Sequence, residues 1–504
     1  MSEPTNPRHP GWARGALAGS LAWAALAAGL PGVAATARAQ EVAVVVSSRA
    51  GDRLQPKPSL RFEPSVTGRK ADFALDTSLG HQAIAGFGAS FLEAGLICLN
   101  SLTPDRQEAV LQALFDPHTG AGFSVMKTPI GATDFMSAGP WYSYDDAPGD
   151  VELQHFSIAR DLGPNGVLTF IKRARRHGSF LLEAPMDYPP DWMLADLEHR
   201  DRQDVDPRYF PALARYYLRY LQEYERNGVT IDYLSLFNEP GIYTKIPYAS
   251  IRDLLAKHVG PLFESAGVRT RLCFAESEDR ETAGASFPTV LDDPAARKYA
   301  AVLMYHAYRL RSSRPIEDLR RRYPDLPVWQ SEVCHAYNAG TPRSMRLPRL
   351  DFDDGDFWGN LIVSDLEAGA SAWLYWNMIL DEKGGPWLVS EVHEDPDPNV
   401  QQAIVHVDRA TRQVTYTGLY YYLAHFSRFV RPGAVRVEVR GALAGARCVA
   451  FRTPEGGVVV QLVNSRKGTA HVRLAWQGRT LQAALPARSI TTLRWPAAAG
   501  GRRP

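Results

Sequence analysis

The chain has 504 residues and is almost electrically neutral, with 56 Lys+Arg against 55 Asp+Glu and a formal net charge of +1. This balance gives no electrostatic reason to expect nucleic acid or an anionic membrane as a partner. Hydrophobic residues make up 45% of the chain, as in globular proteins with a large core. The length allows two to four domains, although α/β barrels often reach this size as one unit.

The N-terminal segment, residues 1–39, is predicted to be an export signal. Two arginines precede the apolar stretch GALAGSLAWAALAAGLPGV, and ARA at residues 37–39 forms a small-x-small cleavage site before Gln40. A membrane anchor is the alternative, but Gly and Pro at residues 29–32 interrupt the apolar run, which is then short for a bilayer span. We therefore expect a secreted or periplasmic protein without stable membrane insertion after cleavage.

The four cysteines are widely scattered and form no CxxC pair. This spacing argues against a zinc site and against a dense disulfide framework. An exported chain permits disulfides, and the sequence leaves open whether any form. The cysteines are Cys98, Cys273, Cys334 and Cys448.

Short β-like pieces occupy residues 40–80, and strand-like runs then alternate with helical stretches over residues 81–410. Most of these runs are nearly continuous in apolar residues, as expected for parallel strands covered by helices. Eight such units predict a (β/α)8 TIM barrel. The candidate strands are residues 83–90, 123–130, 179–185, 232–238, 271–276, 300–308, 326–332 and 370–377.

Three helices are predicted with particular clarity between these strands. The segment 102–115 begins with Thr103 as an N-cap and Pro104 at the first helical position. The segments 209–228 and 355–369 carry apolar faces and end near glycine.

Residues 411–496 have a different pattern. Short alternating strands such as VRVEVR and GVVVQLVN are joined by turns that contain Gly, Pro and Asn, which is typical of a β-sandwich. The early strands of residues 40–80 have no partner in the barrel, so we expect them to join this sandwich. Residues 497–504 are expected to be a disordered tail.

Two glutamates follow apolar strands at positions where a barrel places its active site. Glu239 in SLFNEPG follows the fourth candidate strand, and Glu332 in VWQSEVCHAY closes the seventh. Strand C-termini meet at one face of a barrel, so these carboxyls are expected to face each other. A solvated turn is the alternative for either residue alone. Two carboxyls across a sugar ring are what glycosidic cleavage requires.

Several motifs together resemble glycoside hydrolase family 30, in the branch that contains glucocerebrosidase and bacterial β-glycosidases. The NEP triplet alone is weak, but the ordered set from about Gly80 to the last strand is specific. The motifs are GFGASFLEA (86–94), PIGATDF (129–135), FNEPG (237–241), QSEVCHAY (330–337), GASAWLYWNMILDEKGGPW (369–387) and YYYLAHFSRFVRPGAVRV (420–437). The resemblance implies a (β/α)8 barrel with an attached β-sandwich, retention of anomeric configuration, and no metal or other cofactor.

The resemblance also implies roles for single residues. Glu239 is the expected general acid/base and Glu332 the nucleophile of a double displacement, with the two carboxyls about 5–5.5 Å apart. Sugar-contacting roles are implied for Asn238, Asp134, His306, Tyr308 and Trp376. From the residues alone, Asn238 also suits a turn, Asp134 a helix cap and His306 a core position. Trp373 is expected in the core.

Two positions depart from the family pattern. Asp187 stands where a tryptophan is expected after the third strand, and an acidic side chain there cannot stack on a sugar but can hydrogen-bond hydroxyls or repel an acidic sugar. Lys127 replaces an arginine on the second strand, which exchanges a bidentate fork for a point charge. These changes bear on the substrate more than on the reaction type.

We therefore expect a secreted retaining β-glycosidase that acts on a β-linked carbohydrate or glycolipid, with glucosylceramidase as the family precedent. A β-1,6-glucanase, β-galactanase or β-xylosidase is the alternative enzyme. A carbohydrate-binding pseudoenzyme is the alternative from another class, although the presence of both glutamates argues against it. The sugar, the aglycone, endo or exo action and the oligomeric state are left open.

Overall fold

The computed structural model describes residues 40–65, 70–133, 135–136, 142–195, 204–242, 244–310, 312–335, 350–386 and 400–497. The predicted export signal, Asp134 and all but the first residue of the predicted tail lie outside these ranges.

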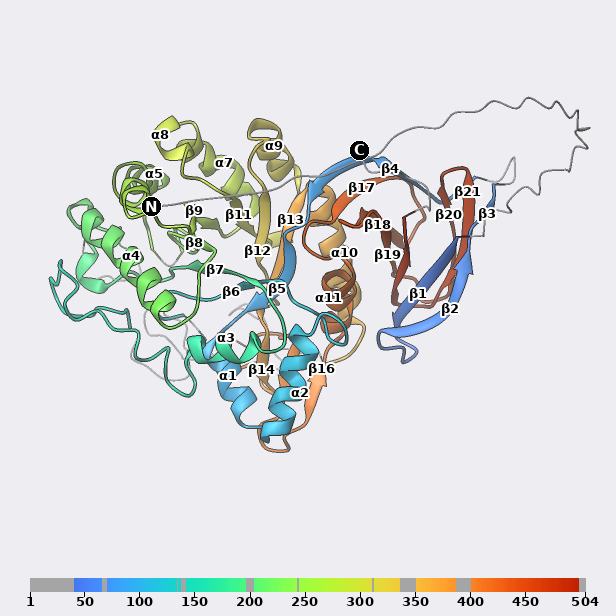
Figure 1. Cartoon of the computed structure of the whole chain (residues 1–504), viewed down its shortest axis with the longest axis horizontal. Helices are drawn as coiled ribbons and strands as arrows, with labels where there is room; N and C mark the ends of the chain where they lie inside the picture. The colour runs from blue at the N-terminus through green and yellow to red at the C-terminus, as the bar shows by residue number, and fades with distance from the viewer. Residues whose placement is uncertain are drawn as a thin grey trace, which may run out of the picture. The chain divides into compact units, whose positions relative to one another are not determined.

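A nearly closed barrel of nine parallel strands forms the larger part of the described chain (Figure 1). The strands are almost entirely buried, as their continuous apolar sequences predict. In sheet order they are β10 (Glu276–Ser277), β11 (Leu303–His306), β12 (Val328–Glu332), β13 (Ala370–Asn377), β5 (Gly86–Ser90), β6 (Val125–Lys127), β7 (Leu181–Pro185), β8 (Tyr233–Ser235) and β9 (Arg271–Cys273).

The nine strands correspond to the eight predicted units because the fifth candidate strand is divided. Residues 271–276 were expected as one strand, whereas β9 ends at Cys273 and β10 begins at Glu276. Isolated bridges from Asn238 to Glu276 and from Leu272 to Ala300 connect the strands on either side of this division. The TIM-barrel prediction is confirmed, with this local difference.

Helices follow most strands and cover the barrel. The predicted segment 102–115 is α2, with Thr103 at the N-cap position, although its side chain makes no capping hydrogen bond. Helix α10 ends at Ala368 and is capped by Gly369, whose φ of 106° is the left-handed conformation that glycine adopts readily. The helices are α1 (Glu93–Asn100), α2 (Pro104–Phe115), α3 (Val167–Ala174), α4 (Phe210–Arg226), α5 (Tyr248–Leu254), α6 (Gly260–Ser265), α7 (Arg280–Leu291), α8 (Pro294–Arg297), α9 (Arg314–Arg322), α10 (Asp354–Ala368) and α11 (Gly418–Phe429).

The second part of the fold is a β-sandwich built from both ends of the described chain. This confirms the prediction that the early strands join the C-terminal sandwich. Strands β1 and β4 of the N-terminal segment pair with β22 and β17 of the C-terminal segment. In sheet order the strands are β2 (Gln55–Arg61), β1 (Glu41–Ser48), β22 (Ser489–Trp495), β19 (Val458–Asn464), β18 (Ala446–Arg452), β17 (Val435–Gly441), β4 (Phe73–Ala83), β20 (Ala470–Trp476), β21 (Arg479–Leu485) and β3 (Glu63–Pro64).

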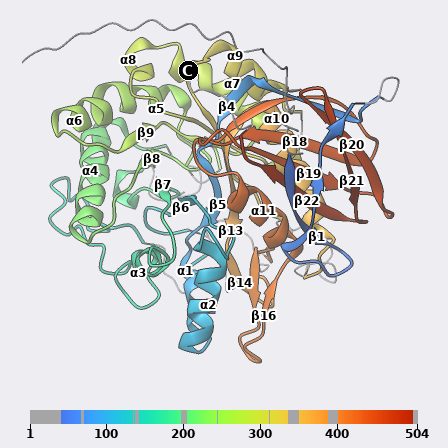
Figure 2. The same cartoon turned by 45° about the vertical axis from the view of Figure 1, so that its right-hand side comes forward.

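Helices α10 and α11 lie between the barrel strands and the sandwich, as Figure 2 shows. Asp356 of α10 accepts hydrogen bonds from Arg488 and Ser465 of the sandwich at 2.6 Å each. The C-terminal sandwich strands begin at Val435. The preceding residues form a small sheet of β14 (Ile379–Asp381), β15 (Val405–Val407) and β16 (Val414–Tyr416), followed by α11.

Two further features concern covalent links and membranes. No disulfide joins the four cysteines, all of which lie within the described part of the chain and are buried. Among the described residues, no helix combines the length and the apolar character that crossing a bilayer requires.

Candidate active site

Glu239 lies just past β8 in a constrained piece of backbone. Its φ is 42°, which is unusual for a residue with a side chain and costs about 1–3 kcal/mol. Two backbone hydrogen bonds hold this conformation: the Glu239 N–H donates to the Glu276 carbonyl and the Asn238 N–H to the Met186 carbonyl, both at 2.8 Å. Neighbouring strands on both sides thus hold the NEP segment in place and aim the carboxyl of Glu239.

Glu332 is the last residue of β12, and each of its carboxyl oxygens accepts a hydrogen bond. The ammonium of Lys127 donates to Oε2 at 2.7 Å, and the hydroxyl of Tyr308 donates to Oε1 at 3.0 Å. Lys127 also supplies the opposite charge. The carboxylate is therefore oriented at both oxygens by groups from β6 and from the segment that follows β11.

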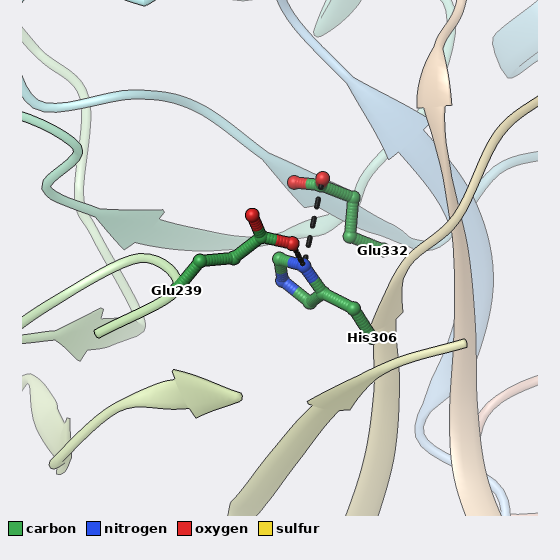
Figure 3. A group of neighbouring side chains, drawn as sticks. All are labelled: Glu239, His306 and Glu332. Carbon is green, nitrogen blue, oxygen red and sulfur yellow. Dashed lines mark hydrogen bonds and ion pairs between the residues drawn. The ribbon is translucent and has the colours of Figure 1, made fainter. Parts of the chain in front are cut away.

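The structure brings Glu239 and Glu332 together, with His306 between them (Figure 3). One carboxyl oxygen from each glutamate and Nδ1 of His306 all lie within 4.8 Å of one another. Retaining glycosidases hold their two carboxyls about 5–5.5 Å apart, and inverting ones about 6.5–9.5 Å apart. An approach of 4.8 Å or less between one oxygen of each carboxyl is compatible with the retaining geometry, in which no water molecule separates the sugar from the second carboxylate.

His306 is completely buried and contacts a carboxyl on each side of its ring. Its Nδ1 donates to Glu239 Oε1 at 2.6 Å and lies 3.6 Å from Glu332 Oε1, while Nε2 lies 3.2 Å from Glu276 Oε2. Burial alone would lower the pKa of His306, but the charge of Glu332 and the contact with Glu239 raise it to about 10. The imidazole is therefore a cation at neutral pH.

The environment of Glu239 favours a protonated carboxyl. Burial raises the pKa of Glu239 above its usual value, and the nearby charge of Glu332 acts in the same direction, although the contact with His306 opposes both. Because Oε1 accepts the His306 hydrogen bond, Oε2 is the oxygen that can carry a proton toward a substrate. The two glutamates thus have different surroundings, as an acid and a nucleophile require.

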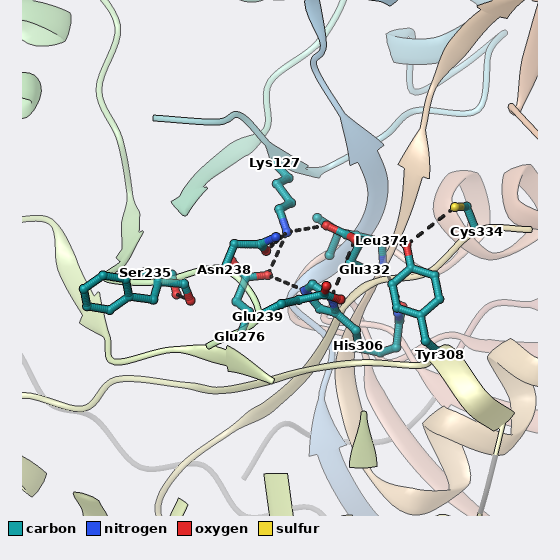
Figure 4. Close-up of polar contacts among 12 residues, drawn as sticks. Lys127, Ser235, Asn238, Glu239, Glu276, His306, Tyr308, Glu332, Cys334 and Leu374 are labelled. Atoms are coloured by element: carbon teal, nitrogen blue, oxygen red, sulfur yellow. Dashed lines mark hydrogen bonds and ion pairs between the residues drawn. The ribbon is translucent and has the colours of Figure 1, made fainter. Parts of the chain in front are cut away.

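Lys127 connects Glu332 to Glu276 and Asn238 (Figure 4). Its ammonium donates to Glu332 Oε2 at 2.7 Å, to Glu276 Oε2 at 2.9 Å and to Asn238 Oδ1 at 3.1 Å. Burial would lower the pKa of Lys127, but the charges of Glu276 and Glu332 raise it above its usual value. The ammonium also lies 5.3 Å from the ring centroid of Trp376.

The trio of Glu239, His306 and Glu332 is also, among the described residues, the group of His, Cys, Asp and Glu side chains whose spacing could hold a metal ion. Two carboxyls of differing proton affinity can cleave a glycosidic bond by themselves. The chemistry of these residues is therefore complete without a metal.

Comparison with protein families decides the assignment. The sequence model of the glycosyl hydrolase family 30 TIM-barrel domain matches residues 84–430, and that of the family 30 beta sandwich domain matches residues 433–493. The chain belongs to glycosyl hydrolase family 30. Family 30 is a retaining family, in agreement with the approach of the two glutamates.

Relatives of this family 30 protein carry different names. It is 27% identical over 412 residues to an endo-1,6-beta-D-glucanase of Neurospora crassa, covering 78% of this chain and 81% of the relative. It is 24% identical over 438 residues to the lysosomal acid glucosylceramidase of Mus musculus, covering 83% and 82%. The solved structure of SrfJ from Salmonella typhimurium has the same fold, with a TM-score of 0.81, 21% identity, and coverage of 90% of this chain and 99% of that chain.

The other predicted site residues of the family 30 protein occupy varied positions. Asn238 and Trp376 are buried and contact Lys127. Asp187 is 1% exposed and lies two residues past β7, where its backbone carbonyl accepts a hydrogen bond from Thr244. Asp134 lies outside the described residues. Trp373 is fully buried and donates to Asp365, as expected for a core residue.

The sequence reasoning missed Glu276, which contacts both Lys127 and His306. A signal was available, because Glu276 ends the fifth candidate strand as Glu332 ends the seventh. It also missed Glu183 on β7, which lies beside Lys127 in the register of the sheet. A glutamate inside an apolar strand of a barrel points either inward or outward, and only the register decides which.

Proposed function

We propose that this chain is a retaining β-glycosidase in which Glu239 is the general acid/base and Glu332 is the nucleophile. The observation that carries the proposal is that one oxygen of each carboxyl lies within 4.8 Å of the other, in contrasting surroundings. Burial favours the proton on Glu239, whereas Lys127 and Tyr308 hydrogen-bond both oxygens of Glu332.

In the first step, a carboxylate oxygen of Glu332 attacks the anomeric carbon as the bond to the leaving oxygen breaks. Glu239 transfers its proton to that oxygen, so the aglycone departs as an alcohol. Negative charge is lost at Glu332 and appears on Glu239. His306 contacts both carboxyls, so its cation stabilises the charge at either position.

In the second step, water attacks the anomeric carbon of the glycosyl-enzyme. Glu239, now a carboxylate, accepts a proton from that water, and the ester bond to Glu332 breaks to regenerate its carboxylate. Two inversions give net retention. Lys127 and Tyr308 are positioned to receive the returning charge on Glu332.

Asn238 is proposed to bind the sugar hydroxyl next to the reacting carbon. Its Oδ1 accepts a hydrogen bond from Lys127, which orients the amide and leaves its NH2 group to donate. A hydrogen bond to the 2-hydroxyl strengthens as the transition state forms. Trp376, beside Lys127, is proposed as the apolar floor on which the sugar ring rests.

The proposed substrate contains a β-linked glucosyl unit at the cleaved bond. Support comes from the relatives, whose names specify a glucosylceramidase and an endo-1,6-beta-D-glucanase, two activities that share a β-glucosyl unit and differ in the aglycone. A glucosylceramidase-like activity and a β-1,6-glucanase are therefore the two leading candidates. Galactoside and xyloside cleavage are outcomes for the test to detect.

The test is covalent trapping with 2-deoxy-2-fluoro-β-D-glucosyl fluoride, followed by intact-mass and peptide mass spectrometry. We expect one added fluoroglucosyl group on Glu332 and none in Glu332→Gln. Azide added to Glu239→Ala should restore turnover and yield the β-glucosyl azide, because azide needs no general base. Labelling at another residue, or formation of the α-azide, would refute the assignment.

A substrate panel tests the aglycone separately. Glucosylceramide in detergent, β-1,6-glucan, and nitrophenyl β-glucoside, β-galactoside and β-xyloside are compared at equal enzyme concentration. Release of ceramide would favour a glucosylceramidase-like activity, and release of short oligosaccharides from the glucan would favour endo action. Binding without turnover across the whole panel would identify a carbohydrate-binding pseudoenzyme.

We also propose that the protein is exported. The support is the pattern of residues 1–39, in which arginines, an apolar stretch and a small-x-small site occur in the order of a signal peptide. Amino-terminal sequencing of the protein from the periplasm or medium is expected to begin at Gln40. A start at Met1 in a cytoplasmic fraction would overturn the proposal.

A further inference from the structure

Glu183 is a buried carboxyl beneath the proposed active site. It lies on β7 directly beside Lys127 of β6 in the register of the two parallel strands. Its side chain is 0% exposed, and neither carboxyl oxygen receives a hydrogen bond from an N–H or O–H group of the described residues. An ionised carboxylate in such a place would be costly, because burial without a donor or a cation disfavours charge.

Lys127 is the nearest candidate for a partner, but its donors are committed. An ammonium group has three N–H bonds. Those of Lys127 go to Glu332, Glu276 and Asn238 at 2.7, 2.9 and 3.1 Å. The arginine that the family pattern places here would offer five donors. With lysine, none remains for Glu183.

Glu276 has one carboxyl oxygen that lacks a hydrogen-bond donor. Its Oε2 accepts from Lys127 and lies 3.2 Å from Nε2 of His306, whereas the buried Oε1 receives no N–H or O–H from the described residues. The carboxyls of Glu183 and Glu276 are close enough for each to act on the pKa of the other. Two neighbouring buried carboxylates are disfavoured when one of them has no cation bonded to it, so one of the pair is expected to carry a proton.

The two surroundings place that proton on Glu183. Burial and the adjacent charge of Glu276 raise the pKa of Glu183 well above its usual value. Burial also disfavours charge on Glu276, but Lys127 and His306 hold the pKa of Glu276 below its usual range. The carboxyl with two cationic neighbours is the ionised member of the pair.

We propose that Glu183 is a positioning residue that donates its carboxyl proton to Oε1 of Glu276. Glu276 then presents a single, fully bonded carboxylate to two cations. One of these cations, Lys127, contacts Glu332, and the other, His306, contacts Glu239. This carboxyl pair therefore sets the positions of both proposed catalytic glutamates from below.

The proton on Glu183 also affects which carboxylates Lys127 binds. Without the proton from Glu183, Oε1 of Glu276 lacks a donor and competes with Glu332 for the ammonium. The inference about catalysis rests on the proposed role of Glu332, whereas the shared proton does not. An experiment that detects the proton directly therefore separates failure of this inference from failure of the proposed function.

The direct test is infrared spectroscopy of the full mature chain at neutral pH. The difference spectrum of wild type minus Glu183→Gln is expected to show the carbonyl stretch of one protonated carboxyl, shifted on exchange into deuterium oxide. Any protonated carboxyl that both proteins share cancels in the difference. A difference spectrum that shows only carboxylate bands would overturn the proposal, whatever the activity.

The kinetic test compares Glu183→Leu with Glu183→Gln. Leucine cannot donate, and loss of one buried hydrogen bond to a charged group is expected to lower kcat on the order of tenfold with little change in KM. Glutamine donates through its amide and is expected to restore most of the loss. If glutamine is as impaired as leucine, donation is not the function of Glu183 and the proposal fails.

A matched control comes from the neighbouring strand. Thr128 follows Lys127, is fully buried, and its hydroxyl has no hydrogen-bond partner among the described residues. Thr128→Val changes polarity in the same region without removing a donated hydrogen bond, so kcat should be nearly unchanged. A loss equal to that of Glu183→Leu would assign the effect to packing and overturn the positioning role.

Discussion

Replacing His306 by leucine removes the cation that contacts Glu239, the proposed acid/base, and we expect the pKa of Glu239 to rise. The Nδ1 hydrogen bond to Glu239 is 2.6 Å long and both groups are buried. The contact with His306 lowers the pKa of Glu239 and partly offsets the effect of burial, so its loss shifts that pKa upward. The neighbouring anions Glu332 and Glu276 also lose a cation, and this acts in the same direction.

The magnitude follows from the strength of a hydrogen bond between charged partners. Such bonds contribute about 1.5–3 kcal/mol. One pKa unit corresponds to about 1.36 kcal/mol. The basic limb of the pH dependence of kcat/KM reports loss of the acid's proton in the free enzyme, so it should move upward by roughly 1–2 pH units.

The assay is kcat/KM for a nitrophenyl β-glycoside across pH, for wild type, His306→Leu and His306→Gln. Glutamine retains a neutral donor and should give a smaller shift than leucine. Dinitrophenolate leaves without protonation, so kcat/KM for a dinitrophenyl glycoside should change little across the pH range of this limb. If the limb of His306→Leu stays in place or moves to lower pH, the proposed electrostatic link between His306 and Glu239 is wrong.

Three further predictions concern stability. The folded-state pKa of His306 is about 10, above the ordinary value of 6.5. Its contribution to stability is therefore fully present below pH 6.5 and is lost as pH rises through about 10. The melting temperature of wild type should exceed that of His306→Gln by less as pH rises across that window, and a difference that grows would contradict the prediction. A Cβ on Gly88 of β5 would lie 1.8 Å from the Val125 carbonyl oxygen, so Gly88→Ala should lower the free energy of unfolding by roughly 3 kcal/mol or more in urea titrations. Gly468→Ala, where the added Cβ meets no atom within 4 Å, should change it by less than about 0.5 kcal/mol, and equal effects would discount the close approach. Arg488→Ala removes the 2.6 Å bond to Asp356 between sandwich and barrel and should cost about 1–2 kcal/mol, against nearly nothing for Arg321→Ala in an exposed pair on α9.

The architecture was readable from the sequence because its signals are local. Continuous apolar runs separated by helical segments predict parallel strands inside a barrel, and alternating runs after residue 411 predict a sandwich. The same locality explains why Glu239 and Glu332 could be placed at one rim, since Glu239 follows one apolar strand and Glu332 ends another. The division of the fifth strand at residues 274–275 had no such signal, because the run RLCFAE is apolar throughout its centre.

Tertiary structure alone decided which charged groups meet inside the barrel and where the protons reside. Lys127 and Glu332 are separated by 205 positions in sequence, yet their side chains are 2.7 Å apart. Whether Glu183 faces inward beside Lys127 depends on strand register, and whether Glu276 or Glu183 is ionised depends on which of them the buried cations reach. Desolvation and Coulomb interactions are set by distance in space. For this reason the identities of the two glutamates could be read along the chain, while the network that distinguishes acid from nucleophile could not.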